Sequence, residues 1–426
     1  MSQSEKENLE KLIRSYESQD YGQAIEVGGK FTKEFAHNGT GWNVLGLSYK
    51  ANGEPNEAIK IFKFLIKALP KNAAYVSNLG NTYMLIGRIQ DGIQCFKKAL
   101  KLEPRLVNAI EALGLAYTEI GRDKDAAKCF TQVIELDPTN QSSAYYLGNL
   151  YLNDRNWVKA KDCLQSIDFG LSQSHILECL LCLDRRSEFE LHYTKLRDEG
   201  YCNPLIGGIV THAQEFYETE FENIFCDNPI GYVQLGRVEE RDGFTESLRN
   251  QLIAYHNRGR NDYRGQNLLH NGSQSSGNIF LLNEPFVANL RKCIETKIDQ
   301  YRQFYRESRA GFLTKWPKEY ELYGWIVSIK DGGNLDAHNH KEGWLSGSFY
   351  LSIPERNSIK SQESSIAFTH SGPRYPAIKK TFEKKVVTVK ERDICCFPSS
   401  LFHETIPFKS SKERISFAFD VIPRTL

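Results

Sequence analysis

Three histidines in the last quarter of the sequence have a spacing that suits metal ligands. His338 and His340 are separated by one residue, and His403 follows about sixty residues later. In an extended segment, residues two apart point to the same face, so the first two side chains can aim into one cavity. Three protein ligands on one face of an octahedral ion leave three positions open. Such a site can accept a bidentate ligand and dioxygen together.

The spacing alone leaves alternatives open. Any one of these histidines, taken singly, would more often be a core or surface residue, and it is the set that favours a metal site. Asp336, two residues before His338, could supply a carboxylate ligand instead, and we rank it second. Cys179 and Cys182 have the spacing of a redox or zinc pair. They lie in an apolar helical stretch with no second pair nearby, which favours packing inside a helix.

Short strands are needed to position these histidines. From Glu321 onward, runs of β-branched and aromatic residues alternate with Gly, Pro, Asn and charged residues, which predicts an antiparallel sandwich or barrel. His403 follows a buried run that ends in a turn, so a strand on the opposite wall could bring it to the same ion. The expected strands are LYGWIVSIK, LSGSFYLSI, SIAFT, KVVTVK, DICCF and RISFAFDVI.

Residues from about 227 to 424 resemble a family of bacterial and phage proteins described as putative 2-oxoglutarate-Fe(II) oxygenases. The resemblance rests on HNHKEGWLSGSFYLSIP and CFPSSLFHETIPFKSSKERISFAFDVI. It implies a double-stranded β-helix, or jelly roll, that holds Fe(II) with the three histidines and uses 2-oxoglutarate and O2 to hydroxylate a substrate. It also implies that Arg414, about ten residues after the distal histidine, grips the far carboxylate of 2-oxoglutarate in a two-pronged contact.

Further residues are expected near that cosubstrate. Ser416 lies two residues after Arg414 and points to the same side, so it could donate to the same carboxylate. Tyr350 and Trp325 could line the pocket, although an aromatic residue in a barrel strand more often belongs to the core.

The ligand pattern departs from the commonest form of these oxygenases, which is His-x-Asp/Glu followed by a distant histidine. Here the pair is His338-x-His340, and three neutral imidazoles would leave the iron with more net positive charge than two imidazoles and a carboxylate. The H-x-H pair recurs in the family that the chain resembles, so the difference does not imply inactivity.

The first half of the sequence repeats with a period of about 34 residues. Leucines recur in one phase, and each is followed by a glycine and then by a tyrosine three residues later; the leucines are Leu45, Leu79, Leu113 and Leu147. The pattern resembles tetratricopeptide repeats (TPR), in which a small residue lets paired helices approach closely. The expected units are four repeats over residues 39 to 168, a degenerate one over residues 5 to 38 and irregular helices from about 170 to 200.

Stacked repeats of this kind form a concave groove that usually binds a protein or peptide segment. Polar amides on the first helix of each pair could face that groove, although solvated helix surface is an equally good explanation for any one of them. The candidate partner-binding residues are Asn43, Asn78, Asn81, Asn108 and Asn149.

The predicted organisation is a multidomain α + β protein. Between the repeats and the strands, two amphipathic helices, 244–255 and 285–304, flank the polar stretch HNGSQSSGN, which favours a loop. The expected domains are a TPR α-solenoid over residues 1 to 200, a helical lead-in and buttress over residues 201 to 320 and a double-stranded β-helix core with the metal site over residues 321 to 426.

Composition excludes several partners. The 54 basic and 53 acidic residues almost cancel, so no overall field attracts nucleic acid or anionic lipid. The opening MSQSEKENLEKLIRSYES lacks the apolar core of a signal peptide, and no run of about eighteen apolar residues predicts a membrane span. We therefore expect a cytoplasmic protein.

The favoured function is an Fe(II)/2-oxoglutarate-dependent hydroxylase that acts on a peptide or protein side chain or on a small metabolite, with the repeats binding a protein or peptide partner. One alternative is a non-catalytic TPR adaptor whose jelly roll binds a ligand or a structural zinc ion. Another is a three-histidine dioxygenase that needs no 2-oxoglutarate. Spacing does not identify the substrate, because pocket selectivity depends on the shape of loops.

Overall fold

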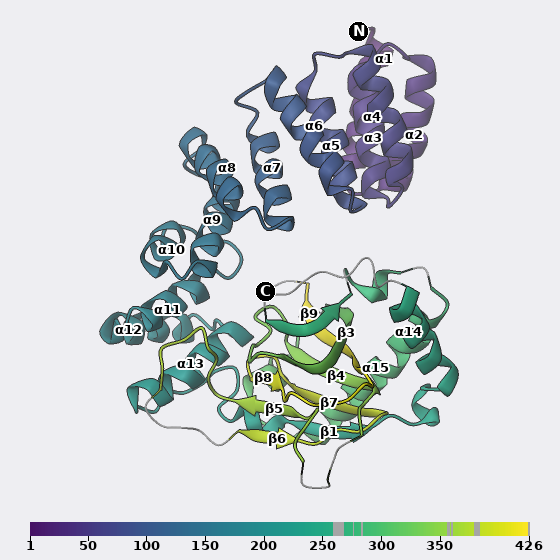
Figure 1. Cartoon of the computed structure of the whole chain (residues 1–426). Helices are drawn as coiled ribbons and strands as arrows, with labels where there is room; N and C mark the ends of the chain where they lie inside the picture. The colour runs from purple at the N-terminus through teal and green to yellow at the C-terminus, as the bar shows by residue number, and fades with distance from the viewer. Residues whose placement is uncertain are drawn as a thin grey trace. The chain divides into compact units, whose positions relative to one another are not determined.

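The chain folds into two compact units, Met1–Ser172 and Gln173–Leu426, which we call the repeat unit and the sheet unit. The computed structural model describes residues 1–258, 268–275, 277–282, 284–355, 358, 361–378 and 384–424. Figure 1 shows that the first unit is built from helices and the second from strands with helices beside them. The finer division at residues 200 and 320 stays a prediction.

The repeat unit is a series of helix pairs. Glycines with positive φ make the turn inside three successive pairs, with φ of +79° at Gly53, +76° at Gly87 and +69° at Gly121. This backbone conformation strains any residue with a Cβ, which explains why glycine recurs there. The helices are α1 (Gln3–Glu17), α2 (Tyr21–Glu34), α3 (Gly39–Ala51), α4 (Pro55–Ala68), α5 (Ala73–Leu85), α6 (Ile89–Leu102), α7 (Val107–Glu119), α8 (Asp123–Leu136), α9 (Gln141–Asn153) and α10 (Trp157–Leu164).

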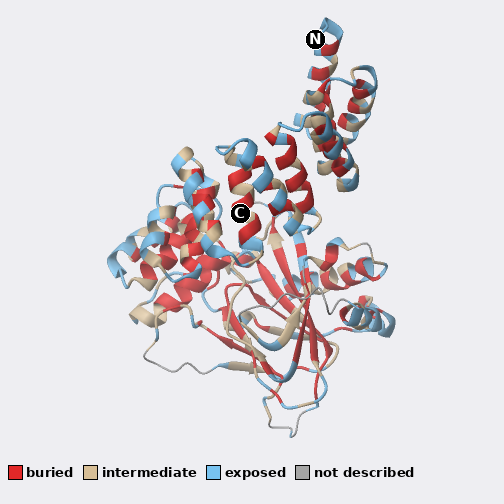
Figure 2. Ribbon diagram, turned by 45° about the horizontal axis from the view of Figure 1, so that its top comes forward, coloured by how far each residue is buried: buried red, intermediate tan, exposed pale blue. Residues whose placement is uncertain are grey.

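Close packing inside each pair depends on the glycine that follows the repeated leucine. A Cβ at Gly80 would lie 2.7 Å from Cε1 of Phe96, and one at Gly114 would lie 2.8 Å from Cε1 of Phe130. Both phenylalanines are fully buried. Figure 2 shows buried and exposed residues alternating around these helices, as expected of amphipathic helices that stack.

The sheet unit begins with helices and ends with strands. The helices predicted over 244–255 and 285–304 are present as α14 (Glu246–Arg258) and α15 (Phe286–Phe304). The other helices are α11 (Ser172–Cys182), α12 (Arg186–Asp198), α13 (Pro204–Tyr217) and α16 (Gly311–Thr314), with short 3-10 turns η1 (Pro229–Tyr232), η2 (Glu240–Asp242) and η3 (Ile279–Leu281). The strands are β1 (Gln234–Arg237), β2 (Leu269–Gln274), β3 (Tyr320–Leu335), β4 (Leu345–Ser352), β5 (Ile366–Thr369), β6 (Lys385–Val387), β7 (Asp393–Pro398), β8 (Phe402–Thr405) and β9 (Arg414–Pro423).

The strands form two antiparallel sheets. The larger has the order β1-β7-β4-β9-β3-β2 and the smaller has the order β6-β5-β8. Alternate residues of β9, among them Phe417 and Phe419, share an apolar core with Leu290 and Ile294 of α15. Because neighbouring residues of a strand point to opposite faces, the other face of β9 is free to form a site.

Part of the stretch expected to be a loop is a strand. Within HNGSQSSGN, residues up to Gln274 belong to β2, which pairs with β3; Ser276 lies outside the described residues. A Cβ at Gly272 would lie 2.6 Å from the carbonyl oxygen of Ser328, so glycine is what allows the close pairing. The polar composition suggested a loop, because polar residues seldom indicate a strand by themselves. The strand that pairs with β2 lies about fifty residues further along the chain, where no local pattern reveals it.

Helices capable of crossing a membrane are absent from the part of the chain that the structure describes, since none combines the required length with sufficient apolar character.

Candidate metal centre

Backbone pairing brings the three predicted histidines together. His338 lies just after β3, and His403 lies on β8 of the smaller sheet. The two residues form an antiparallel bridge, in which His338 N donates to His403 O at 3.1 Å and His403 N donates to His338 O at 2.9 Å. His340 N donates to the carbonyl oxygen of Ser399 at 3.1 Å. The segment after β3 therefore closes the gap between the two sheets.

The three side chains converge. Their candidate ligand atoms all lie within 4.8 Å of one another. The ring centroids are 4.3 Å apart for His338 and His403, 5.2 Å for His338 and His340, and 5.0 Å for His340 and His403. Within the described residues, this is the group of histidine, cysteine and acidic side chains that could hold a metal ion.

Hydrogen bonds orient each imidazole in the same way. Nδ1 of His338 lies 2.8 Å from the carbonyl oxygen of Asp336, and Nδ1 of His403 lies 3.3 Å from the carbonyl oxygen of Leu401. Nδ1 of His340 lies 2.7 Å from Oδ1 of Asp420. Because these partners accept, each Nδ1 carries a proton, and the neutral form of each ring keeps the Nε2 lone pair for a metal ion.

Asp420 is a part of this site that the sequence analysis missed. Its carboxylate is buried and also accepts a hydrogen bond from Ser346 Oγ at 2.6 Å. A carboxylate behind a ligating histidine raises the basicity of the ring and fixes its tautomer. The signal was present in β9, where Arg414, Ser416, Ala418 and Asp420 are each two residues apart and therefore share a face.

Burial keeps two of the imidazoles neutral. Burial and the neighbouring His340 lower the pKa of His338 to about 4. Burial and the neighbouring His338 hold the pKa of His403 well below its usual value. A neutral imidazole is the form that binds metal ions, so the environment favours the ligand state at neutral pH.

The alternative ligands have other partners. Oδ2 of Asp336 lies 2.8 Å from Nε2 of His270, and Oδ1 accepts from Nδ2 of Asn334 at 2.8 Å. The hydrogen bond to His270 is the main reason that the pKa of Asp336 is lowered. Cys179 and Cys182 lie on α11, and burial raises the pKa of Cys182.

A cavity of about 670 Å³ extends along the inner face of the large sheet beside the histidines. Alternate residues of β9 line it from Arg414 through Ser416 to Ile422, and Trp325 of β3 lines it opposite Ala418. The predicted Trp325 contact is thus present, and its ring centroid lies 5.5 Å from that of His340.

Arg414 places a buried cation at one end of this cavity. The residue is 3% exposed, its Nε donates to the carbonyl oxygen of Ser364 at 3.1 Å, and its Nη1 lies 3.5 Å from Oγ of Ser416. The guanidinium carbon lies 5.1 Å from the ring centroid of Tyr350, which is fully buried. Burial lowers the pKa of Arg414, although a guanidinium stays charged in a protein.

The segment after β3 that carries His338 and His340, which we call the metal loop, is tied by a buried carboxylate to two other segments. Glu178 of α11 is 0% exposed; its Oε2 lies 3.3 Å from Nζ of Lys341, and its Oε1 lies 2.9 Å from Nε of Arg374. Burial would raise the pKa of Glu178, but Lys341 and the hydrogen bond from His175 outweigh it and lower the pKa well below its usual range. Lys341 directly follows His340, so α11 helps to hold the metal loop in place.

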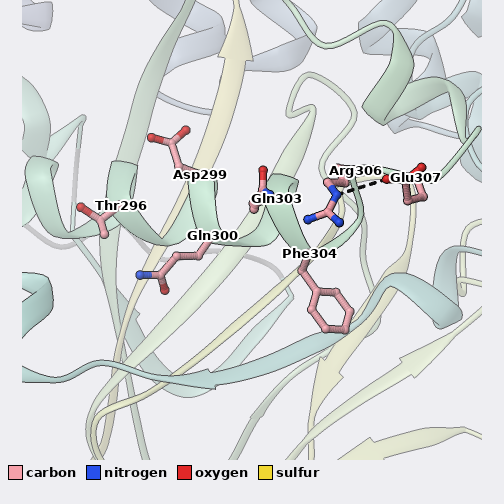
Figure 3. Close-up of a pocket in the computed structure, with 7 residues that line it drawn as sticks. All are labelled: Thr296, Asp299, Gln300, Gln303, Phe304, Arg306 and Glu307. Atoms are coloured by element: carbon pink, nitrogen blue, oxygen red, sulfur yellow. Dashed lines mark hydrogen bonds and ion pairs between the residues drawn. The ribbon is translucent and has the colours of Figure 1, made fainter.

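A second hollow, of about 730 Å³, lies along α15 and the turn that follows (Figure 3). Arg306 and Glu307 pair there at 3.1 Å, and Phe304 is 70% exposed. The lining residues include no histidine or cysteine: they are Thr296, Asp299, Gln300, Gln303, Phe304, Arg306 and Glu307. This hollow offers no chemistry comparable to that of the histidine site.

Comparison with protein families supports both halves of this description. Residues 323–420 match a family described as "Putative 2OG-Fe(II) oxygenase". Tetratricopeptide-repeat families match residues 73–106, 109–144 and 129–162. A search of curated proteins found no match.

Solved structures that match this chain include three proteins with the following coverage. PilF of Pseudomonas aeruginosa is 16% identical with a TM-score of 0.42, and the alignment covers 46% of this chain and 91% of that one. A MamA crystal structure is 23% identical with a TM-score of 0.33, covering 36% and 89%. The thermophilic TPR protein TTC0263 of Thermus thermophilus is 18% identical with a TM-score of 0.35, covering 45% and 99%.

The chain therefore joins N-terminal TPR repeats to a C-terminal 2-oxoglutarate-Fe(II) oxygenase domain. The predicted fold class, a helical repeat array followed by a jelly-roll domain, is confirmed. This family implies Fe(II) and 2-oxoglutarate, and the histidine cluster is a possible site for the iron.

Proposed function

We propose that this protein is an Fe(II)/2-oxoglutarate-dependent hydroxylase of peptide or protein side chains, with His338, His340 and His403 as its iron ligands. The observation that carries this proposal is the shared orientation of the three imidazoles. Each has its Nδ1 hydrogen-bonded to an acceptor, and their candidate ligand atoms lie within 4.8 Å of one another. Histidines placed only for packing have no reason to bring three ring nitrogens so close together while each Nδ1 is hydrogen-bonded elsewhere.

The charge on the site is compatible with iron although the third ligand is a histidine. Asp420 accepts from His340, so a carboxylate stands behind that ring where the commoner triad has a carboxylate in contact with the metal. The negative charge thus lies one hydrogen bond away from the metal ligand and not on the ligand itself, and it still stabilises a cation at the site. Asp336, committed to His270 and Asn334, is the weaker candidate.

The chain also offers a place for the cosubstrate. Arg414 forms an ion pair with no carboxylate among the residues that the structure describes, and a buried cation without an anion is costly. A carboxylate of 2-oxoglutarate would satisfy its guanidinium, and Ser416 could donate to the same group. Tyr350 would act from behind by supporting the guanidinium with its ring.

Bound iron and cosubstrate would supply oxidative decarboxylation of 2-oxoglutarate to succinate and CO2, coupled to insertion of one oxygen atom into a C–H bond of the substrate. The contribution of the protein is to orient the ligands, fix the diacid and limit the access of water. Phe368 and Phe397 pack against His403, with ring centroids 6.3 Å and 4.6 Å from its own. These apolar rings keep water from that side of the site.

The repeats suggest how a macromolecular substrate could be held. TPR repeats typically bind protein segments, and four of the five candidate asparagines are half-buried while Asn108 is exposed. Nδ2 of Asn78 donates to Oδ1 of Asn43 at 2.8 Å, so neighbouring repeats already link two of these amides. We include in the proposal that this surface of the repeat unit binds a peptide.

Anaerobic titration tests the central proposal. Fe(II) added to the full-length protein with 2-oxoglutarate should give the visible charge-transfer band of a bidentate chelate. Arg414→Ala should raise the 2-oxoglutarate concentration needed for half-saturation by about 100-fold, as expected on loss of a buried charge-assisted contact. Arg306→Ala, on the hollow of Figure 3, is the matched control and should leave it unchanged.

Two results would contradict the proposal in different ways. A protein that binds Fe(II) without the band would be a metal-binding adaptor. A protein that consumes O2 equally well without 2-oxoglutarate would be a three-histidine dioxygenase, and Arg414→Ala would then have little effect.

A further inference from the structure

We infer that the end of the cavity opposite Arg414 selects a positively charged group, the side chain of a lysine or arginine in a peptide substrate. This inference rests on the proposed function, because it names the substrate class of the same site. It follows from the distribution of charge and aromatic rings along the cavity.

The cavity is a trench with two unlike ends. Along β9 its lining runs from Arg414 to Ile422, eight residues or roughly 26 Å at about 3.3 Å per residue. The end near Arg414 is buried and basic. At the other end, Glu321 of β3 pairs in register with Ile422, and both side chains line the trench.

Glu342 reaches the same end from the metal loop. The following residues fix its place, because a Cβ at Gly343 would lie 3.0 Å from Cγ of Asp420 and Trp344 N donates to the carbonyl oxygen of Val421 at 2.7 Å. Glu342 lines the trench and is exposed, as is Glu321. Two carboxylates therefore border the open end from two different segments.

Most other charges of the trench are already committed. Lys341 pairs with the buried Glu178, and Asp420 accepts from His340. Arg414 is the proposed partner of the cosubstrate. Glu321 and Glu342 have no ion-pair partner within the part of the chain that the structure describes. The charge that remains for a substrate to neutralise is thus negative.

Aromatic rings lead from that end to the histidines. Tyr323 is 38% exposed and its ring centroid lies 5.7 Å from that of Trp325, which lies 5.5 Å from that of His340. A cation that enters between carboxylates and aromatic faces gains both ion-pair and cation–π attraction. An acidic substrate would be repelled by the same surface. An extended cationic side chain would place its carbons along the rings and close to the metal centre.

A peptide panel tests this inference. The full-length protein, loaded anaerobically with Fe(II) and 2-oxoglutarate, is titrated into fluorescent peptides that share one neutral sequence and differ in a central Lys, Arg, Leu or Glu. Anisotropy should show the Lys or Arg peptide binding about tenfold tighter than the Leu peptide, with the Glu peptide weakest. Competition with free lysine and arginine tells whether the peptide backbone contributes.

Substitutions of the carboxylates test which residues cause the preference for cationic peptides. The double variant Glu321→Gln with Glu342→Gln should lose most of the preference for the cationic peptides while the charge-transfer band with 2-oxoglutarate stays. Glu307→Gln removes a carboxylate that is 89% exposed on the hollow of Figure 3 and should keep the preference.

Failure of the two proposals can be told apart. Loss of the band in the wild-type protein would overturn the proposed function. A normal band with equal or reversed binding of the four peptides would overturn the substrate class alone. A preference that survives in the double variant would overturn the assignment of the two glutamates.

Discussion

Buried polar groups of the repeat unit and of the sheet unit reach partners at very different separations along the sequence. In the repeat unit, buried hydroxyls such as those of Thr32 and Ser48 donate to the carbonyl oxygen four residues earlier in their own helix. In the sheet unit, Glu178 is bound to Lys341 and Arg374, more than about 150 residues away in the sequence. Because these hydroxyls have local partners, their hydrogen bonds form within one helix of a repeat. Because the partners of Glu178 are distant, the metal centre depends on the fold of the whole sheet unit.

The largest difference in stability between the two units should appear when the core of the repeat unit is damaged. Phe96→Ala removes a fully buried ring beneath Gly80 and should cost about 4 kcal/mol of unfolding free energy. Hydrogen exchange should increase in α5, α6 and the neighbouring helices. Binding of Fe(II) and 2-oxoglutarate should not change.

Phe64→Ala is the control, because that ring is 47% exposed, and a much smaller loss is expected. Equal losses in both units after Phe96→Ala would show that the comparison between two independently stabilised units is wrong.

Breaking the buried ion cluster around Glu178 should destabilise the sheet unit and not the repeat unit. Glu178→Gln leaves Lys341 and Arg374 without their shared carboxylate and should cost about 3 kcal/mol. Exchange should rise in α11 and in the segment after β3, with the repeat unit unaffected. Glu188→Gln, which alters a carboxylate with 53% side-chain exposure, is the matched control and should be nearly neutral. If neither variant changed the unfolding free energy, the cluster would make no contribution to stability.

Acid should destabilise the sheet unit more than the repeat unit, and His212 alone should account for about 2 kcal/mol of that difference. Burial lowers the pKa of His212 to about 4, so the unfolded chain binds a proton there near pH 6.5 and the folded sheet unit does not. The stability from this group is present above pH 6.5 and is lost as the pH falls toward 4. Denaturant unfolding of the metal-free protein at pH 7.5 and pH 5 measures it.

His212→Phe should remove about 2 kcal/mol of that dependence and leave the part that comes from the buried His338 and His403. His37→Phe in the repeat unit, whose side chain is 76% exposed, should not change it. An unchanged slope in His212→Phe would count against the assignment.

The smallest effect concerns the carboxylate behind His340. Asp420→Asn keeps the shape but removes the charge, and should lower Fe(II) affinity by about tenfold. Anaerobic metal competition measures the change. Asp299→Asn, on a side chain that is 75% exposed, should bind Fe(II) like the wild type. Equal affinities for the Asp420 and Asp299 variants would show that the hydrogen bond only positions the ring.

Much of this protein could be predicted from local patterns. The repeat phase of Leu45 and its equivalents, the two helices before the strands and the six main strands were all present in the spacing of apolar residues and glycines. So were the three histidines, because alternate residues of an extended segment share a face. Binding of metal by these histidines and the roles of Arg414, Ser416 and Tyr350 stay predictions.

The sequence alone could not reveal β2 or the short strand that carries His403. Both are polar or brief, and they become strands only because a partner strand supplies hydrogen bonds. Glu178 lies on a largely apolar helix, and no local pattern indicates its two cationic partners, because Lys341 and Arg374 are distant in the sequence.

The sequence by itself determined the repeat array, the jelly-roll class and which residue types could bind a metal ion, since these follow from periodicity over a few turns or strands. Only the tertiary structure decided that Asp420 stands behind His340, that Tyr350 supports Arg414 and that two glutamates border the open end of the trench. Such contacts join residues from different strands and loops, and their distances depend on sheet register and packing, which no local pattern encodes.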